Sequence, residues 1–414
     1  MAAIIKQNKS LLITICSIYI IFGSVSLIME NLHLDETESH LPTLKLFYSS
    51  NPFDAFQSRD YKSASTPLPY IIASIPYKIF NSAPDIFSAR LINILISLVT
   101  IFIFIRLCDV KTKIILYPAL ILFFYPYFVK PSFLFFMSIY GLFFFLLFIY
   151  FVKKRNGTGY LLGGLSLSLA ILSQQFYLVV FLFYIGFLFY NSKKYNFNKE
   201  KLLDLPLFIL PFILPLVVFI LWGGITHPAY RYWGAEFNIQ NLTSIFIVLG
   251  SAMLPFLIFS VSGIRKLHLV ILLPLSVLLV LFAYPEWVNE PTVGGISGYT
   301  FHSLALVGSF NSILSFLFKV LFCLLGLFSL IILYNKTGND KIRLLYFLFL
   351  FLVIGFCFNK LPSERHLIPL VSMAYLIAFS LINKVFIYKV WLVFQLIIGS
   401  VYFYYIMFVY SSRL

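Results

Sequence analysis

The chain has 414 residues, of which 61% are hydrophobic and only 11% are charged, and it contains 49 phenylalanines and 27 tyrosines. Soluble domains contain roughly a quarter charged residues, so this composition excludes a cytoplasmic enzyme, a secreted disulfide scaffold and a disordered protein. Its apolar runs are continuous rather than alternating, which excludes an outer-membrane β-barrel. We therefore expect an all-α polytopic membrane protein.

Thirteen apolar runs, bounded by charged or turn residues, predict about thirteen transmembrane helices within one integral membrane domain covering residues 1–414. The first run follows Lys6 and Lys9 and has no convincing cleavage site, so we expect a retained signal anchor. In chain order the runs cover residues 11–29, 86–106, 114–128, 132–152, 159–173, 175–190, 203–222, 242–264, 267–284, 310–334, 344–358, 366–383 and 390–410.

The distribution of lysine and arginine predicts a cytoplasmic N-terminus, because short basic connectors stay on the cytoplasmic side. The net charge of +15 then gathers on that side. Anionic lipid accounts for this charge, so no nucleic-acid partner is expected. The composition, rich in Lys, Asn, Ile and Phe, points to the plasma (inner) membrane of a prokaryote.

Three outer connectors are longer than the others: residues 30–85, 223–241 and 284–309. They contain most of the acidic residues and four of the six histidines. Chemistry is therefore expected on the extracytoplasmic face. The four cysteines lie singly along the chain, which indicates neither a metal knuckle nor a redox pair.

The first of these connectors begins with neighbouring carboxylates, Asp35 and Glu36. A carboxylate can act as a general base where burial or a like-charged neighbour raises its pKa. The alternative is an ordinary solvated acidic loop start. Two further segments, residues 41–48 and 69–80, are too short to cross the bilayer and are expected to be interfacial helices.

The order of motifs in the first hundred residues resembles a known superfamily. The motifs are Leu34-Asp35-Glu36 after the first span, Thr66-Pro67-Leu68-Pro69-Tyr70 before an interfacial helix, and Arg90-Leu91-Ile92-Asn93 at the second span. This order resembles the GT-C polytopic glycosyltransferases, particularly the bacterial relatives of protein O-mannosyltransferases and the lipid A aminoarabinose transferase. A weaker likeness links it to the α-1,2-glucosyltransferase of dolichol-linked glycans.

The resemblance implies a GT-C-like bundle that moves one sugar from a polyprenyl-phosphate carrier to an acceptor hydroxyl on a lipid, glycan or protein, with inversion. It makes Asp35 the general base, and gives Glu36 the role of positioning the acceptor or holding a divalent metal. Several relatives have a lysine in the turn before the interfacial helix, and this chain lacks it. The departing phosphate also needs cations, for which the outer-face candidates are Arg59, Lys62, Arg231, Lys360 and Arg365.

A second stretch of the resemblance is Arg365-His366-Leu367-Ile368-Pro369, which resembles a late Arg-Tyr-x-x-Pro element but has His366 in place of tyrosine. Here Arg365 could clamp phosphate with its bidentate fork. Alternatively it reaches the interface and pairs with Glu364. Lys360, in the same connector, has the further alternative of an interfacial anchor.

The remaining candidate binding residues each have a structural alternative. Gln174 and Gln175 interrupt an apolar stretch, and they mark either a site or a simple turn. His227 and Arg231 would suit a wall that faces sugar and phosphate, although aromatic belts contain the same mixture. Tyr70 belongs to the turn motif. Further open features are residues 286–295, as a mobile lid or a passive connector, and Lys319, a charge inside a predicted span.

Two other functions remain open from the sequence. A transporter or flippase of lipid-linked saccharides would place polar residues along a central path, but most predicted spans have no ionisable residue. A polymerase or ligase would join lipid-linked glycan blocks and would also use outward loops.

Overall fold

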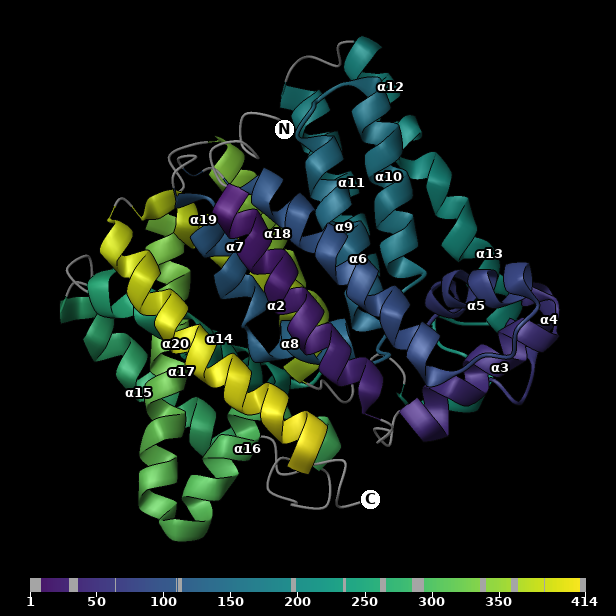
Figure 1. Cartoon of the computed structure of the whole chain (residues 1–414). Helices are drawn as coiled ribbons and strands as arrows, with labels where there is room; N and C mark the ends of the chain where they lie inside the picture. The colour runs from purple at the N-terminus through teal and green to yellow at the C-terminus, as the bar shows by residue number, and fades with distance from the viewer. Residues whose placement is uncertain are drawn as a thin grey trace. The chain divides into compact units, whose positions relative to one another are not determined.

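The structure, a computed structural model, describes residues 9–29, 36–63, 65–108, 110, 114–194, 199–233, 236–260, 266–284, 294–335, 340–358, 364–382 and 384–409. Throughout these ranges the regular elements are helices (Figure 1). The chain divides into two compact units: unit 1 comprises Met1–Leu107, Val129–Gly234 and Phe403–Leu414, and unit 2 comprises Cys108–Phe128 and Ala235–Tyr402.

The described helices confirm an all-α protein built for a membrane. Five are long and apolar enough to span one: Ile86–Leu107, Asp204–Trp222, Ile239–Ser260, Ser312–Asn335 and Val385–Phe408. A sixth span results if the bent pair Pro126–Phe133 and Ser138–Val152 is counted as one, and seven further helices are apolar but shorter. Each of the thirteen predicted runs overlaps a helix. The number of crossings and their orientation stay predictions.

Unit 1 contains the first connector and the helices around it. Its elements are α2 (Lys9–Ile28), η1 (Glu36–His40), α3 (Leu41–Ser49), α4 (Pro52–Gln57), α5 (Leu68–Phe80), α6 (Ile86–Leu107), α8 (Pro126–Phe133, the first residues of which count with unit 2), α9 (Ser138–Val152), α10 (Gly157–Ile171), α11 (Tyr177–Lys194), α12 (Lys199–Ile209), η3 (Leu210–Phe212), α13 (Ile213–Trp222) and η4 (Pro228–Trp233).

The first connector folds into short helices with clear sequence signals. Asn51 caps α4, since its side chain accepts a hydrogen bond of 3.0 Å from the backbone N–H of Phe53. The next helix, α5, ends at Asn81, which adopts a left-handed conformation with φ 49°. The two segments expected to be interfacial helices are thus confirmed as helices, α3 and α5. Their place at a membrane interface stays a prediction.

A buried aromatic cluster holds the first connector together and joins it to the ends of α10 and α13. Its members include Phe47, Phe56, Tyr61, Tyr70 and Tyr77 from the connector, with Phe135 and Met137 from the link between α8 and α9, Leu172 from the end of α10, and Trp222 from α13. Burying aromatic rings of this size is the main stabilising contribution to such a segment. The connector is therefore a packed element rather than a solvated loop.

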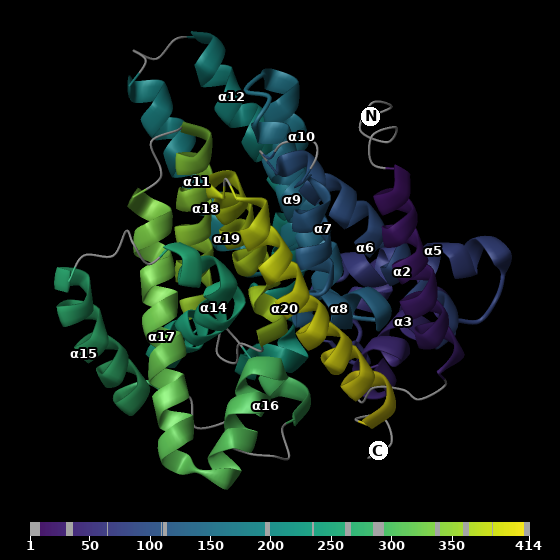
Figure 2. The ribbon, with the colours of Figure 1, turned by 60° about the vertical axis from the view of Figure 1, so that its left-hand side comes forward.

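Unit 2 contains the later helices (Figure 2). They are α7 (Leu116–Phe123), α14 (Ile239–Ser260), α15 (Lys266–Phe282), α16 (Gly294–Phe310), α17 (Ser312–Asn335), α18 (Asp340–Cys357), η8 (Glu364–Leu367), α19 (Ile368–Leu381) and α20 (Val385–Tyr404), the end of which counts with unit 1, as does η9 (Tyr405–Val409).

Helices α14 and α17 pack closely because each has a glycine at the contact. A Cβ atom added at Gly250 would lie 1.9 Å from the carbonyl oxygen of Phe322, and one at Gly326 would lie 2.0 Å from that of Phe246. Only glycine permits this approach of two backbones, which is a common way for helices to associate in membranes.

The connector predicted over residues 284–309 is in large part helical. Gly294 and Gly295, the last two residues of the segment 286–295 left open as a lid or a passive connector, lie in the first turn of α16. This helix continues to Phe310, and α17 begins at Ser312. The rest of the expected lid, residues 286–293, lies outside the described residues.

Candidate functional site

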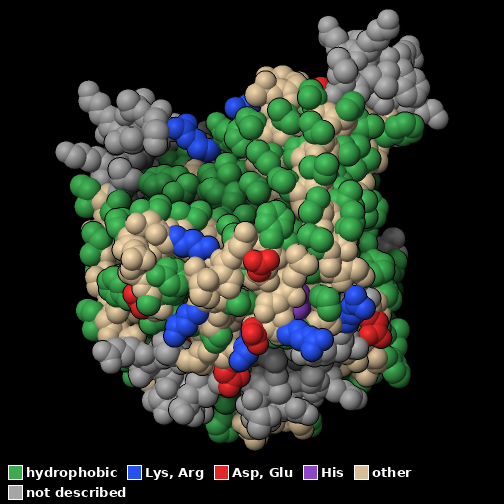
Figure 3. Space-filling model, turned by 90° about the vertical axis from the view of Figure 1, so that its right-hand side faces the viewer, with side chains coloured by type: hydrophobic (Ala, Val, Ile, Leu, Met, Phe, Trp, Pro, Cys, Tyr) green, Lys and Arg blue, Asp and Glu red, His purple; other side chains and the backbone are tan. Residues whose placement is uncertain are grey.

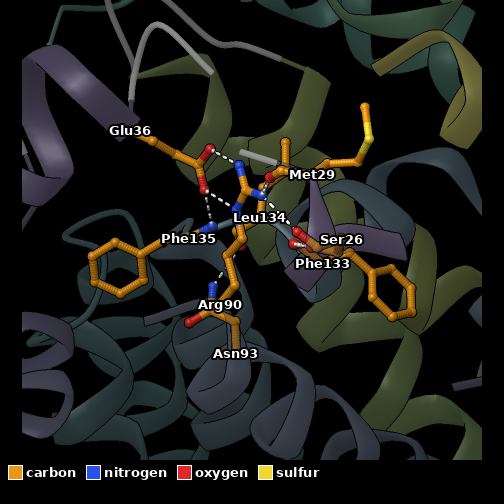
Figure 4. Close-up of polar contacts among 8 residues, drawn as sticks. All are labelled: Ser26, Met29, Glu36, Arg90, Asn93, Phe133, Leu134 and Phe135. Atoms are coloured by element: carbon orange, nitrogen blue, oxygen red, sulfur yellow. Dashed lines mark hydrogen bonds and ion pairs between the residues drawn. The ribbon is translucent and has the colours of Figure 1, made fainter. Parts of the chain in front are cut away.

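The carboxylate of Glu36 and the guanidinium of Arg90 form a buried ion pair in unit 1 (Figure 4). Nε of Arg90 donates to Oε1 of Glu36 at 3.0 Å, and the second terminal nitrogen, Nη2, donates to Oε2 at 2.7 Å. The side chains of Arg90 and Glu36 are 1% and 0% exposed. Two parallel charge-assisted bonds fix both the position and the orientation of the carboxylate.

Arg90 also binds the end of the first helix. Its Nη1 donates to the carbonyl oxygens of Ser26 at 2.7 Å and of Met29 at 3.0 Å. The last carbonyl groups of a helix have no partner within the helix, and a cation satisfies them well. One arginine on α6 therefore joins the end of α2 to the start of the first connector.

The third component is a sharp break between α8 and α9, which meet at an angle of 112°. The backbone N–H of Phe135, within the break, donates to Oε1 of Glu36 at 2.7 Å. The hydroxyl of Ser26 donates to the carbonyl oxygen of Phe133. A break leaves backbone groups without helical partners, and within a membrane these groups must be bound by protein.

Asn93, one helical turn after Arg90, binds the remaining carbonyl groups of the break. Its amide nitrogen donates to the carbonyl oxygens of Pro131, Leu134 and Phe136 at 3.1, 2.8 and 3.0 Å. Residues three apart on a helix share a face, which explains why Arg90 and Asn93 act on the same break. We call these groups the Glu36–Arg90 cluster: Ser26, Met29, Glu36, Arg90, Asn93 and residues 133–136.

His40 lies beside this cluster, at the end of the π-helical turn that Glu36 begins. Its ring packs edge-on against Phe136, with 5.3 Å between centroids. The Nδ1 atom of His40 lies 2.8 Å from the hydroxyl of Tyr70, which in turn donates to Oγ of Ser63 at 2.8 Å. Tyr70, predicted to bind substrate, is fully buried in this hydrogen-bonded chain.

His227 and Arg231 from the second long connector approach the first connector. The His227 ring lies 4.9 Å from that of Tyr61 and 5.4 Å from that of Trp222, and burial lowers its pKa. Arg231 is exposed and donates to the carbonyl oxygen of Trp222 at 3.0 Å. Trp222 itself donates to the carbonyl oxygen of Phe56 at 2.8 Å. The two connectors therefore form one packed structure.

Gln174 and Gln175 occupy the short link between α10 and α11. Gln174 is buried, and its Oε1 atom has no hydrogen-bond partner among the described residues. Its amide lies over Gly141 of α9, where an added Cβ atom would be 2.9 Å from Oε1. Gln175 is half-buried. A buried hydrogen-bond acceptor without a partner costs free energy. Gln174 therefore stays a candidate binding residue.

The sequence analysis missed Lys130, and it gave Arg90 and Asn93 no role beyond their motif. Lys130 lies in α8, is 6% exposed, and has its Nζ atom 4.9 Å from the centroid of the Phe136 ring. A buried lysine in a broken membrane helix is a common sign of a functional site. It lies between the predicted runs 114–128 and 132–152, where a lysine between two apolar stretches could have drawn attention.

The other predicted cations of unit 1 lie elsewhere. Arg59 and Lys62 are exposed, and neither makes a hydrogen bond or ion pair with the Glu36–Arg90 cluster. Asp35 lies outside the described residues, directly before Glu36 in the chain.

The candidates of unit 2 are described in part. Glu364, Arg365 and His366 form the turn η8 before α19, with His366 half-buried. The side chains of Glu364 and Arg365, and Lys360 as a whole, lie outside the described residues. Lys319 has its Nζ atom 3.9 Å from the centroid of the Tyr284 ring, a cation–π contact that stabilises the charge within α17.

Neither a metal site nor a disulfide is found among the described residues. The described residues contain no group of three His, Cys, Asp or Glu side chains that could hold a metal ion. All four cysteines are free, and three of them are buried.

No family model matches the chain, and no curated protein sequence matches it either. The fold is similar to the crystal structure of ArnT from Cupriavidus metallidurans in the apo state, with a TM-score of 0.44 and 12% sequence identity. That similarity covers 95% of this chain and 78% of the ArnT chain. A TM-score this low supports no conclusion about the function of this chain.

Proposed function

We propose that the protein is an inverting glycosyltransferase, which moves one hexose or pentose from a polyprenyl-phosphate carrier to an acceptor hydroxyl on the extracytoplasmic face. The observation that carries this proposal is the Glu36–Arg90 pair, 54 residues apart in the chain and joined by two hydrogen bonds. These residues belong to the first and third of the motifs in the first hundred residues that resemble the GT-C glycosyltransferases. Two motifs that are recognisable in the sequence thus meet at one buried point.

In the proposed reaction Asp35 is the general base. Its carboxylate takes the proton of the acceptor hydroxyl while the acceptor oxygen attacks the anomeric carbon from the face opposite the phosphate. The bond between that carbon and the phosphate oxygen breaks, and the lipid phosphate leaves with the electron pair. The configuration at the anomeric carbon is inverted.

Glu36 acts as a positioning residue in this proposal. Both of its oxygens accept hydrogen bonds from Arg90, and one also accepts from Phe135. Positioning of a reacting group contributes strongly to catalysis, and we propose that this firmly held carboxylate supports the reaction of Asp35. The acceptor-positioning role expected from the resemblance would then act through Asp35.

The negative charge on the departing phosphate requires cations close to the membrane surface. We propose Lys130, buried beside the break, as one of them. Arg231, Lys360 and Arg365 stay candidates for the same role. Tyr70, Gln174, His227, Glu364 and His366 stay candidates for binding the sugar or the acceptor.

The alternative functions use the same surfaces differently. A flippase of lipid-linked saccharides would need charged side chains free to contact a moving headgroup, whereas Arg90 and Glu36 satisfy one another. A polymerase or ligase would consume a carrier with an oligosaccharide and two phosphates. The nature of the donor separates that function from the proposed one.

The test is to incubate the purified full-length protein with a panel of radiolabelled polyprenyl-phosphate monosaccharides, with and without EDTA. Released lipid phosphate and transferred or hydrolysed sugar are measured, together with donor binding. Release from one monosaccharide donor supports the proposal, and the EDTA arm tests the expected metal. If no donor binds while oligosaccharide-diphosphate lipids are turned over or translocated, the proposal is wrong.

A further inference from the structure

The first connector carries an open depression of about 470 Å³ on its surface. The depression has three walls. Helix α3 forms the first, Asp60 and Lys62 form the second, and Ala83 and Pro84, which follow α5, form the third. The lining residues are Pro42, Lys45, Leu46, Tyr48, Ser49, Asp60, Lys62, Ala83 and Pro84. This volume is large enough for the polar headgroup of a lipid.

The charges of the depression favour an anion. Lys45 and Lys62 line it together with one carboxylate, that of Asp60. A third lysine, Lys78, donates from its Nζ atom to the carbonyl oxygen of Ser50 at 3.2 Å, one residue beyond the lining residue Ser49. On this side of unit 1, basic and acidic side chains gather below a broad hydrophobic surface (Figure 3). Two ammonium groups and one carboxylate leave a net positive site, which suits a phosphodiester with one negative charge.

Exposed apolar side chains of α5 indicate how deep the depression would lie in a membrane. Helix α5 buries Tyr70 and Tyr77 on one face, while Ile75, Ile79 and Phe80 on its other side are 48%, 70% and 77% exposed. Exposed apolar residues on an amphipathic helix insert at the boundary between headgroups and acyl chains. Phe80 lies three residues before Ala83, which lines the depression. If α5 lies at this boundary, as the sequence predicts, Lys45 and Lys62 come at the level of the lipid phosphates.

We propose that this depression binds the phosphate of an anionic membrane phospholipid, of the phosphatidylglycerol class. Lys45 and Lys62 contact the phosphate, while Ile79 and Phe80 lie among the acyl chains. This lipid anchors the first connector to the membrane, and it is distinct from the sugar donor. The site assigns Lys62 to a structural lipid rather than to the departing phosphate, and it does not depend on the proposed glycosyltransferase activity.

The test measures binding of short-chain phosphatidylglycerol, phosphatidylcholine and inorganic phosphate to the full-length protein in neutral detergent. The key variant is Lys45→Gln with Lys62→Gln, two exposed positions whose replacement leaves the packed cluster intact. The matched control is Lys384→Gln with Lys389→Gln, which removes the same charge from exposed positions that do not line the depression. A Phe80→Ser variant tests the apolar contribution.

The parent protein should prefer phosphatidylglycerol over phosphatidylcholine, and the key variant should lose about fivefold in affinity for each lysine removed. The control pair should keep the preference, and Phe80→Ser should weaken both lipids. An unchanged preference in the key variant would overturn the proposal. So would phosphate binding that depends on the two lysines but gains nothing from acyl chains, since the ligand would then be free phosphate. None of these outcomes requires sugar transfer, so they separate this inference from the proposed function.

Discussion

Arg90 and Glu36 meet through hydrogen bonds of 3.0 and 2.7 Å in a place that solvent does not reach. This pair joins three parts of the chain that the sequence keeps apart: the end of α2, the start of the first connector and the break between α8 and α9. A buried pair of this kind is only stabilising when its remaining hydrogen-bonding groups are satisfied, as they are here by two carbonyl oxygens and one N–H.

Removing the cation of this pair should be costly. Arg90→Met leaves a buried carboxylate without its partner, so we expect a loss of about 3–5 kcal/mol in stability. Replacing both charges, with Arg90→Met and Glu36→Leu, should recover much of that loss but not the transfer activity. Thermal unfolding and donor turnover are measured for both. A double variant as unstable as the single one would show that the loss comes from the backbone groups of Ser26, Met29 and Phe135 left without partners, and not from the unpaired charge.

Asn93→Asp tests whether the hydrogen bonds from Asn93 to the carbonyl groups around the break between α8 and α9 stabilise the protein. The substitution keeps the shape of the side chain but replaces an amide that donates to three carbonyl groups with an oxygen that cannot donate. We expect a loss of about 3 kcal/mol or more, since each unsatisfied buried group costs about 1–3 kcal/mol. Thr100→Val is the control on the same helix, because its hydroxyl donates only to Ile96 of α6, at 2.7 Å. Similar unfolding temperatures for the two variants would contradict this assignment.

Gly326→Ala should separate α14 from α17. The new Cβ atom would lie 2.0 Å from the carbonyl oxygen of Phe246, so the two backbones must move apart. We expect a loss of about 3 kcal/mol, the upper end of the usual cost of overpacking. Gly186→Ala in α11 is the matched control, because no atom lies within 4 Å of its added Cβ. That control should be neutral or stabilise by up to about 1 kcal/mol, as alanine favours helix.

His227 should make the stability depend on pH. Burial lowers its pKa in the folded protein, so the unfolded chain takes up the proton more readily. The contribution of neutral His227 to the free energy of unfolding is therefore fully present well above the ordinary histidine pKa of about 6.5, and it decreases as the pH falls through that value. His227→Phe keeps a ring against Tyr61 and Trp222 and should flatten this dependence. Unfolding temperatures between pH 8 and pH 5 give the comparison, and identical profiles would exclude His227 as the cause.

Hydrophobicity alone located the helices well, because a membrane helix must be apolar along its whole length. Residues 86–106 and 310–334, for example, were predicted close to the observed α6 and α17. The break before α9 could not be found in this way. Its residues, Leu134 to Met137, are as apolar as the helices beside them, and the bend depends on contacts with Glu36 and Asn93.

For the candidate site, the sequence indicated several of the residues but not how they pair. The resemblance singled out Glu36, and it marked Arg90 and Asn93 as motif residues without a role. Pairing them required the fold, because 54 residues separate the two charges. Lys130 was overlooked because it lies among the three residues, 129–131, that separate two predicted runs and read as a short connector. The segment 286–295 was left open between a lid and a passive connector, and its last two residues, Gly294 and Gly295, begin helix α16.

The central claim concerns Asp35, and the most direct measurement is the rate of sugar transfer by Asp35→Asn with a donor that the parent turns over. The amide keeps the shape of the carboxylate but cannot accept the proton, so a loss of at least about 10²-fold is predicted, within the usual range for a general base. Asp54→Asn, at an exposed carboxylate of the same connector, should transfer at the parent rate. Transfer by folded Asp35→Asn within a few-fold of the parent would contradict the account.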